Sequence, residues 1–576
     1  MKSFSDIILE TAYEIFTNKL RGLERRKMRR SAFLFLLLIP AAAFAQHDHG
    51  AKPAPGKPVT LETGLGSVNH KVTTKSPQAQ KFFNQGLAYI YAFNHAEAIK
   101  AFKQAAALDP GLAMAYWGTA LALGSNYNLP ADSAALKEAY ANLQKAVSLA
   151  PKASAGERGY IEALSRRYAT DPDKADLPAL AVAYKTAMSE LVKKYPDDLD
   201  AATLYAESMM NLRPWQLWTL DGRPAEGTLE IVAVLEGVLK RDPNHSGANH
   251  YYIHTVEASP NPERALPSAK RLGLLAPNAG HLVHMPSHIY IRTGDYVEAA
   301  KSNADAILVD QNYIGKNGPQ GVYPMMYYNH NIHFLASANA MNGNYAGAIK
   351  SARDLHDNVK PLVKTMPMLE MFTPYPMVTL VRFRKWEVIL REQMPTEEMA
   401  ITTAMQHFAR GMAYAETGQP TLALRERAFL MEKKRAVPAD APWGNSAAHN
   451  VLAIAANLLA GETLLGPGGN RKTAIEYLQS AVKAEDAVNY NEPPDWDLPA
   501  REWLGRALLT DGQFAEAEKV YREELAKHPK NGRALFGLME SLTRQGKDGE
   551  LSAVKKEFEK AWEKADTRLT VTDLYF

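Results

Sequence analysis

The stretch that decides the fold covers residues 82–110 and reads FFNQGLAYIYAFNHAEAIKAFKQAAALDP. Large apolar side chains such as Phe82, Leu87 and Phe102 recur at helical spacing, with small residues between them. Pro110 closes the stretch, because proline cannot continue a helix. The segment before it, to about residue 76, is rich in proline, glycine, threonine and lysine, so we expect the helices to begin just after that segment.

The order of residue types in this stretch resembles the tetratricopeptide repeat, which has a bulky start, a small residue, a tyrosine, then alanine, phenylalanine, alanine and a closing proline. The matching residues are Phe82, Gly86, Tyr89, Ala98, Phe102, Ala105 and Pro110, and His95 departs from the usual aromatic. Further copies resemble it at residues 282–300, 343–345, 411–418 and 504–517. The resemblance implies an all-α superhelical solenoid of about a dozen stacked antiparallel helix pairs. This fold is mainly a binding scaffold, so the resemblance says little about function.

The chain is expected to have four regions. These are a signal peptide over residues 1–45, a flexible linker over 46–76, the solenoid over 77–565 and a C-terminal tail over 566–576. Longer connections that keep large aromatic side chains are expected in the solenoid at 213–228, 312–324, 365–376, 437–445 and 489–499. Such loops often pack over a ligand groove; the alternative is that they only seal gaps between imperfect repeats.

The N-terminus has the features of a secretory signal. Basic residues 27–30 precede an apolar run at 32–38, and Ala43-Phe44-Ala45 forms a small-x-small cleavage site before Gln46. Met28 is an alternative start, since the residues before it are unusual for a signal peptide. The apolar run is shorter than the roughly 20 residues of a membrane span. We therefore expect a periplasmic or secreted protein with no transmembrane segment after cleavage. The segment Asn491–Asp497 also resembles one found in exported bacterial members of the repeat family, whose function is uncharacterised.

Composition excludes several kinds of site. The net charge is only +3, with 66 basic and 63 acidic residues spread through the chain, so no basic surface indicates a nucleic-acid partner. The chain has no cysteine, which excludes disulfides, thiolate metal sites and a cysteine nucleophile. Any bound metal must be held by nitrogen and oxygen.

Histidines recur at the repeat length. His250 and His284 are 34 residues apart, as are His254 and His288, so each pair occupies equivalent places on neighbouring helices. A third helix carries two more histidines in the register of His281 and His284, namely His330 and His333. The repeat therefore predicts a patch of histidines on three adjacent helices.

Each set of histidines lies on one face of its helix. At about 100° per residue, His281, His284 and His288 fall within a 60° arc. Glu257 falls in the same arc as His250 and His254, and Glu207 has the register of His254 one helix earlier. In tetratricopeptide proteins the first helix of each hairpin lines the concave groove, so the resemblance places these side chains there.

The histidine patch predicts a transition-metal site. Histidines at i and i+3 or i+4 can chelate one ion, and seven imidazoles exceed the needs of one tetrahedral site, so two ions, or one ion with outer groups, are expected. The proposed ligands are His250, His254, Glu257, His281, His284, His288, His330 and His333. Nitrogen ligation without sulfur suits Zn, Cu, Ni or Fe and does not choose among them. Glu257 or Glu207 is a speculative general base for a metalloenzyme.

Two metal-free alternatives remain open. The groove could take an extended peptide or a protein of the cell envelope, or it could bind a small molecule under the aromatic loops. Further polar residues predicted to line the groove are Asn126, Asn128, Glu207, Asn211 and Arg213. The sequence contains no phosphate-binding glycine loop, Gly-x-Ser-x-Gly elbow or His-Glu-x-x-His signature, so no enzyme class is indicated.

Overall fold

The ring of Phe102 shows how neighbouring helix pairs lock together. It packs between Gly86, in its own hairpin, and Gly118, in the next, where an added Cβ would lie 2.6 and 2.5 Å from the ring. Near the other end of the chain, Tyr521 packs between two glycines in the same way. One large ring set against two glycines allows close approach of the helices, so each hairpin is fixed on its neighbour.

The computed structural model describes residues 58–395, 399–466 and 468–576. The predicted signal peptide and the start of the predicted linker lie outside the described residues. The first helix, α2 (Pro77–Tyr91), begins where the sequence predicts, since Ser76 caps it by accepting a hydrogen bond from the Ala79 N–H and Pro77 takes the first position.

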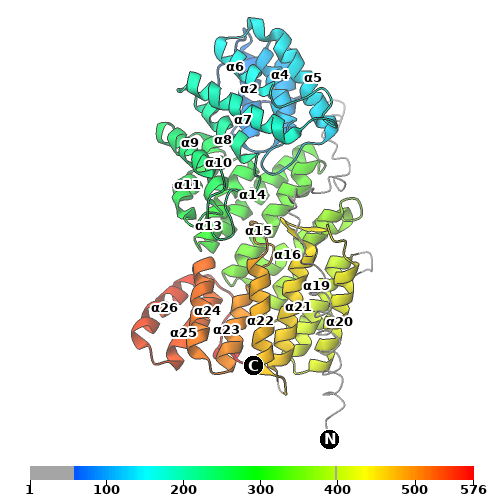
Figure 1. Cartoon of the computed structure of the whole chain (residues 1–576), viewed down its shortest axis with the longest axis vertical. Coiled ribbons are helices and arrows are strands. Elements are labelled where there is room, and N and C mark those ends of the chain that lie inside the picture. Colours follow the sequence, from blue (N-terminus) through cyan, green and yellow to red (C-terminus); the bar gives the residue numbers. More distant parts are fainter. Residues whose placement is uncertain (1–57, 396–398, 467) are drawn as a thin grey trace, which may run out of the picture. The chain divides into compact units, whose positions relative to one another are not determined.

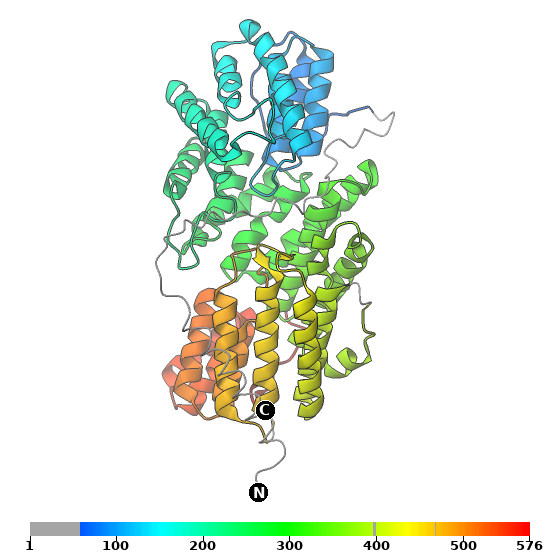
Figure 2. The same ribbon diagram turned by 45° about the vertical axis from the view of Figure 1, so that its right-hand side comes forward.

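The described chain is an all-α solenoid, which confirms the predicted fold class; Figures 1 and 2 show helices stacking on their neighbours along the chain. After α2 the helices up to the histidine region are α3 (His95–Leu108), α4 (Ala113–Ala122), α5 (Ser133–Leu149), η1 (Ala150–Lys152), α6 (Ala155–Leu164), α7 (Leu177–Lys194), α8 (Leu199–Met210), α9 (Thr228–Arg241), α10 (Ser246–Val256), η2 (Pro262–Ala265), α11 (Leu266–Leu275), α12 (Gly280–His284) and α13 (Pro286–Arg292). The middle of the chain forms α14 (Tyr296–Asn317), the π-helical turn η3 (Tyr323–Tyr327), α15 (Tyr328–Met341), α16 (Tyr345–Val359), η4 (Lys360–Leu362), η5 (Pro367–Phe372), α17 (Tyr375–Arg382) and α18 (Trp386–Arg391).

The C-terminal part continues the array with α19 (Ala400–Glu416), α20 (Pro420–Ala436), α21 (Ala448–Leu465), α22 (Arg471–Asp486), α23 (Ala500–Thr510), α24 (Phe514–Lys527), α25 (Gly532–Arg544), α26 (Asp548–Ala561) and η6 (Val571–Leu574). In the described part of the chain, the strands are confined to one antiparallel pair, β1 (Pro442–Trp443) and β2 (Ser446–Ala447), in which Pro442 is opposite Ala447.

Two large apolar cores hold the array together, one between Leu65 and Tyr327 and one between Met377 and Leu574, with smaller clusters around α14 to α16. Helix α21 is long and apolar enough to cross a membrane by length and composition alone, but 72% of it is buried inside the protein. It is therefore placed as a core helix.

Residues 58–76 correct the prediction of a flexible linker, because this stretch packs along the solenoid. The Glu62 N–H donates to Gln85, the Val72 N–H donates to Gln80, and His70 pairs with Asp200 at 2.9 Å. Side chains of α2 and α8 thus supply the hydrogen bonds that a segment of low apolar content cannot make for itself.

The predicted C-terminal tail also packs on the fold. Its Asp566 accepts hydrogen bonds from the Tyr345 and Ala346 N–H groups at the start of α16, at 2.6 and 2.9 Å. Leu574 is buried in the second core. These contacts fix the tail against both α16 and the C-terminal helices.

Candidate metal centre

The predicted histidines lie on adjacent helices. Helix α10 carries His250 and His254, helices α12 and α13 carry the next three, and α15 carries the last two: His281, His284, His288, His330 and His333. Pro286 divides the second set, as the sequence predicts, because α12 ends at His284 and α13 begins at Pro286. Met285 keeps helical backbone angles across the break, so His284 and His288 remain one turn apart.

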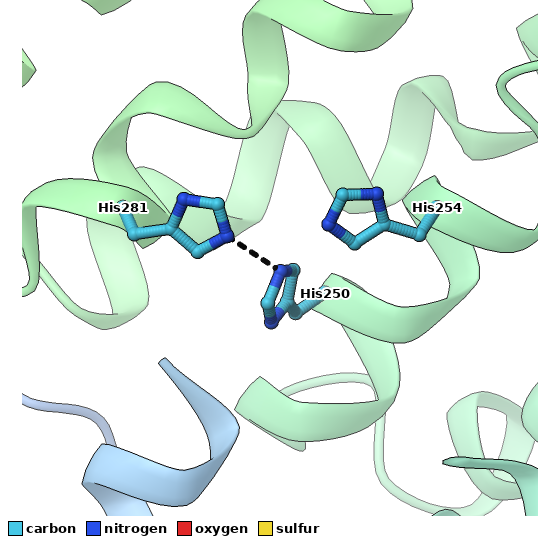
Figure 3. Close-up of side chains that lie close together, drawn as sticks. All are labelled: His250, His254 and His281. Carbon is cyan, nitrogen blue, oxygen red and sulfur yellow. Dashed lines mark hydrogen bonds between the residues drawn. The ribbon is translucent and has the colours of Figure 1, made fainter. Parts of the chain in front are cut away.

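Three imidazoles form a first group, His250, His254 and His281, whose ligand nitrogens lie within 4.8 Å of one another. Figure 3 shows the first two on one helix and His281 approaching from another. The Nε2 atoms of His281 and His250 are 3.1 Å apart. All three side chains are buried. We call this set group 1.

Three further imidazoles form group 2, His284, His288 and His330. The Nε2 of His284 lies 2.8 Å from that of His288 and 3.2 Å from that of His330. His284 and His288 are fully buried, and His330 is partly exposed. The two groups are neighbours, since the rings of His254 and His288 have centroids 5.4 Å apart.

Group 2 repeats group 1 position by position. Each group takes two histidines one turn apart, from α10 in group 1 and across the α12–α13 break in group 2, and a third from the next histidine-bearing helix. The first two ligands recur after 34 residues, and the third recurs after 49, from His281 to His330. The longer interval accommodates the 22-residue helix α14 and the π-helical turn η3.

Glu257 joins the two groups from their outer side. One of its carboxylate oxygens accepts from His254 Nδ1 at 2.9 Å, and the other accepts from His288 Nδ1. Burial raises the pKa of Glu257, but the two imidazoles lower it more, to about 2. An ionised carboxylate only accepts hydrogen bonds, so both imidazoles carry their proton on Nδ1. The carboxylate thereby leaves Nε2 of each ring free to bind a ligand.

Two further acceptors fix imidazoles in the same tautomer. His250 Nδ1 lies 2.7 Å from the Tyr91 carbonyl oxygen, which can only accept. His284 Nδ1 lies 2.7 Å from Asn303 Oδ1, and the Asn303 amide nitrogen donates to the Ala299 carbonyl, which identifies Oδ1 as the acceptor. This is the arrangement of metal-ligating histidines, whose second nitrogen is held by a carboxylate or carbonyl.

Four Nε2 lone pairs therefore face the interior of the site. His284 and His288 present theirs to each other at 2.8 Å, and two acceptors at that distance require a positive charge between them, either a proton or a metal ion. His254 Nε2 is buried and has no hydrogen-bond partner among the described residues. Two nitrogens that each lie about 2.05 Å from one ion are about 2.9–3.4 Å apart at ordinary coordination angles. The spacings of 3.1 and 3.2 Å fall within this range, and the 2.8 Å between His284 and His288 lies just below it.

Burial keeps the imidazoles neutral. It is the largest cause that lowers the pKa of His250, His281, His284 and His330 well below the ordinary 6.5, and neighbouring histidines lower it further. Burial also lowers the pKa of His254, against the opposing effect of Glu257. Neutral imidazole is the form that binds metal, so these five imidazoles are in their binding form at neutral pH.

Aromatic rings cover the groups. Phe93 stacks on His254 and His281, with centroids 5.8 and 5.6 Å apart. Tyr127 and Trp215 stack on each other and contact the His254 ring at 5.2 and 5.9 Å. Trp215 belongs to one of the aromatic loops that the sequence predicts to cover a groove. The loops therefore pack directly on the imidazoles, and the groove that the sequence predicts is closed over group 1.

The loop at residues 489–499 approaches from the C-terminal half. Arg292 donates to the Glu257 carbonyl at 3.0 Å, and its Nε lies 4.0 Å from Glu492 on this loop. Tyr490 also donates to Glu492 at 2.7 Å. Burial raises the pKa of Glu492 to about 7, and Oε2 of this carboxyl has no hydrogen-bond partner among the described residues.

His333 is not brought into either group. Its Nε2 lies 3.9 Å from Asp497 Oδ2, and its ring packs on Tyr375 at 4.0 Å. It shares the register of His284, but Ser337 stands where the second histidine of a third group would lie, and that serine donates to Asp497. The pattern of paired histidines thus ends after two groups.

The two carboxylates predicted as general bases, Glu257 and Glu207, make other contacts. Both oxygens of Glu257 accept hydrogen bonds from ligand imidazoles. Glu207 is hydrogen-bonded to Asn211, its pKa is raised by burial against the pull of Arg167, and it belongs to neither group. Glu257 contacts the Nδ1 atoms of its imidazoles and not the Nε2 atoms that would hold an ion.

The other predicted groove residues lie around the cover. Asn126 turns the loop that carries Tyr127, by accepting from the Asn128 and Leu129 N–H groups at 2.9 Å. The Asn128 amide approaches the Tyr327 hydroxyl at 3.5 Å, and the Tyr327 ring packs on His281. By contrast, Arg213 is exposed and pairs with Glu226.

Sequence reasoning missed the residues that orient the ligands. No pattern marks the Tyr91 carbonyl or the Asn303 side chain, because both are defined by helices that meet only in the folded chain. Arg292, which holds the backbone of Glu257, is likewise missed.

A separate polar cluster ties residues 58–76 to the solenoid. Ligand atoms of His70, Asp198 and Asp200 lie within 4.8 Å of one another, beside a cavity of about 450 Å³. Tyr91 and His70 donate to Asp200, and Tyr160 donates to Asp198. The carboxylates already have partners, so we assign this cluster a structural role.

Comparisons with known proteins agree with the fold. Residues 79–112 and 498–541 each match the sequence profile of the tetratricopeptide repeat. These matches cover α2 with α3 and α23 to α25, the regions in which Phe102 and Tyr521 pack against paired glycines. The chain therefore contains tetratricopeptide repeats, and such repeats generally mediate interactions between proteins.

Solved structures with similarity along the chain include the human IFIT1 dimer with m7Gppp-AAAA, yeast Tom70 and the TPR domain of P58(IPK). Their identities to this chain are 14%, 13% and 12%, and their TM-scores are 0.33, 0.27 and 0.21. The alignments cover 85%, 84% and 82% of this chain and 91%, 93% and 99% of those chains. With TM-scores below 0.5, none of their functions is transferred to this chain. A comparison with curated protein sequences gives no match.

Proposed function

We propose that this tetratricopeptide-repeat protein binds two transition-metal ions, one in each histidine group. The observation that carries the proposal is the fixed tautomer of four imidazoles. His250, His254, His284 and His288 each donate from Nδ1 to a fixed acceptor and direct Nε2 into the site. Packing alone does not explain this arrangement, because the buried Nε2 of His254 has no donor among the described residues and the Nε2 atoms of His284 and His288 face each other at 2.8 Å.

The remaining ligand in each group completes a set of three nitrogens. His281 approaches His250, and His330 approaches His284, at the nitrogen spacings expected of two ligands on one ion. Three protein ligands leave a coordination position for a small molecule, as in catalytic metal sites. Catalysis is therefore compatible with the geometry, but neither predicted base serves it.

The proposed metal sites lie in a repeat scaffold of the protein-binding class. We propose, from the N-terminal sequence, that the protein is exported and that a partner in the cell envelope binds the solenoid. The small-molecule alternative is disfavoured over group 1, because Phe93, Tyr127 and Trp215 occupy the space over those imidazoles.

Elemental analysis tests the proposal. The chain is purified without an affinity tag and its metal content is measured, with two equivalents of transition metal expected per chain. The double variant His284→Ala with His288→Ala should retain one equivalent, because it removes two of the three ligands of group 2 and none of group 1.

The matched control replaces two histidines that lie outside the groups, His356 and His407, by alanine. It should keep both equivalents. A metal-free protein whose thermal stability does not change when Zn, Cu, Ni or Fe is added would contradict the proposal and leave a metal-free scaffold.

A further inference from the structure

The six ligands of the two groups bring no negative charge to the site. All are imidazoles, which bind a metal ion as neutral ligands. The nearest carboxylate, Glu257, supplies one negative charge on the outer side of His254 and His288. Glu492 lies beyond it and faces Arg292, which offsets its charge. One net negative charge therefore compensates the positive charge of two ions.

This balance favours ions of low charge. Two divalent ions with Glu257 leave a net charge of three in a buried site, whereas two monovalent ions leave a net charge of one. The cost of burying a charge is large and rises steeply with its size, unless an opposite charge compensates it. Hydroxide or another anion would have to accompany divalent ions into a site whose group 1 is covered by aromatic rings.

The number of ligands available to each ion also favours a monovalent ion. The side chains over group 1 are the rings of Phe93, Tyr127 and Trp215, and Phe334 packs on group 2. A third candidate set, His254, Glu257 and His288, includes a carboxylate, but Glu257 contacts the Nδ1 atoms of these imidazoles and not the Nε2 atoms that face groups 1 and 2. Zinc in proteins is usually four-coordinate, so zinc in either group would need a fourth ligand from solvent or from a bound small molecule. A monovalent copper ion is satisfied by three nitrogens.

We infer that the two groups hold a pair of monovalent copper ions, one bound by His250, His254 and His281 and the other by His284, His288 and His330. The inference rests on the proposed function, because it names the metal for the same sites. Each ion has three neutral ligands at the same repeat positions, and the pair shares one carboxylate.

A competition experiment without oxygen tests the inference. The metal-free full-length chain is given equal excess concentrations of Cu(I) and Zn(II), freed of unbound metal by gel filtration, and assayed for both elements. We expect two equivalents of copper and no zinc. X-ray absorption near the copper edge should show three-coordinate Cu(I) with nitrogen ligands.

A second experiment changes the charge of one ligand in group 2. His330 is partly exposed, so His330→Asp should be tolerated, and it places a carboxylate in group 2. Compared with His330→Ala, the aspartate variant should bind Zn(II) in group 2 at least about tenfold more tightly and should not recover Cu(I) binding. The aspartate variant His356→Asp, outside both groups, is the matched control and should behave as the parent chain.

The outcomes separate the two claims. Zinc in both groups in the presence of Cu(I) would overturn the inference and leave the metal site standing. Tighter binding of Cu(I) by His330→Asp than by His330→Ala would overturn it as well, because the charge argument requires the opposite. Binding of neither metal by a correctly folded chain would overturn the proposed function itself.

Discussion

Replacement of Glu257 by glutamine should lower the binding affinity for one metal ion and leave the affinity for the other unchanged. Each carboxylate oxygen of Glu257 accepts from one imidazole, His254 in group 1 and His288 in group 2. A glutamine side chain has one acceptor oxygen, and its nitrogen only donates. It can therefore hold one of the two imidazoles with its proton on Nδ1. The other imidazole must place its proton on Nε2, where it blocks the metal.

The expected magnitude follows from the role of this carboxylate. Loss of an outer acceptor on a ligating histidine lowers metal affinity roughly 10–100-fold, or about 1.4–2.7 kcal/mol. Because glutamine retains one acceptor, the loss should fall on one ion. The parent chain should therefore bind two equivalents tightly, and Glu257→Gln should bind one equivalent tightly and the second with the lowered affinity.

Titration of the metal-free chain in competition with a chromophoric chelator measures both affinities. Glu298→Gln is the matched control, since Glu298 is an exposed glutamate on α14, and circular dichroism checks the helical content of both variants. Unchanged affinity of both ions, or an equal loss at both, would refute the reasoning that one carboxylate orients one ligand in each group.

Three further predictions follow from groups around the site. Asn303→Ala removes the hydrogen-bond acceptor of His284, so the free energy of unfolding should fall by about 1–3 kcal/mol and the metal affinity of group 2 alone should fall. Asn303→Asp keeps an acceptor and should restore the affinity of group 2 in the same chelator titration. Trp215→Ala removes a ring that covers His254, so a chelator should remove the metal faster in stopped-flow measurements. Because Trp215 is only partly buried, the free energy of unfolding in urea should fall by about 1–2 kcal/mol, less than for a fully buried tryptophan. Burial raises the pKa of Asp310 to about 7, against hydrogen bonds that lower it, so the folded chain holds this proton more tightly than the unfolded chain and stability is lost as pH rises from about 4 to 8. In urea unfolding, the parent chain should lose about 4 kcal/mol of unfolding free energy over that range relative to Asp310→Asn. Parallel pH profiles of the two chains would contradict this pKa assignment.

The fold could be predicted from sequence because its signals are local. Gly86 and Phe102 lie in one hairpin, and their spacing already fixes how two helices meet. The register of His250 with His284 was equally readable, because stacked repeats present equivalent positions side by side.

The rest of the site depends on contacts between distant segments. The Tyr91 carbonyl reaches His250 across 159 positions, and the Asn303 side chain reaches His284 from α14. His333 has the spacing of a ligand, yet Asp497, from a loop far along the chain, lies nearest its free nitrogen. The predicted linker at 58–76 is ordered by partners such as Gln85, which no local pattern reveals.

The hydrogen bond from His250 to the Tyr91 carbonyl joins the first helix of the array to its ninth, α10. In an ideal solenoid each repeat contacts only its neighbours, so stability is a sum of adjacent interfaces and unfolding can begin at either end. Here α2 packs directly on α10. The N-terminal repeats therefore cannot fray independently of the histidine helices, and residues 77–292 should unfold as one cooperative block. A chain shortened by its first hairpin would lose the orientation of His250 as well as the hairpin.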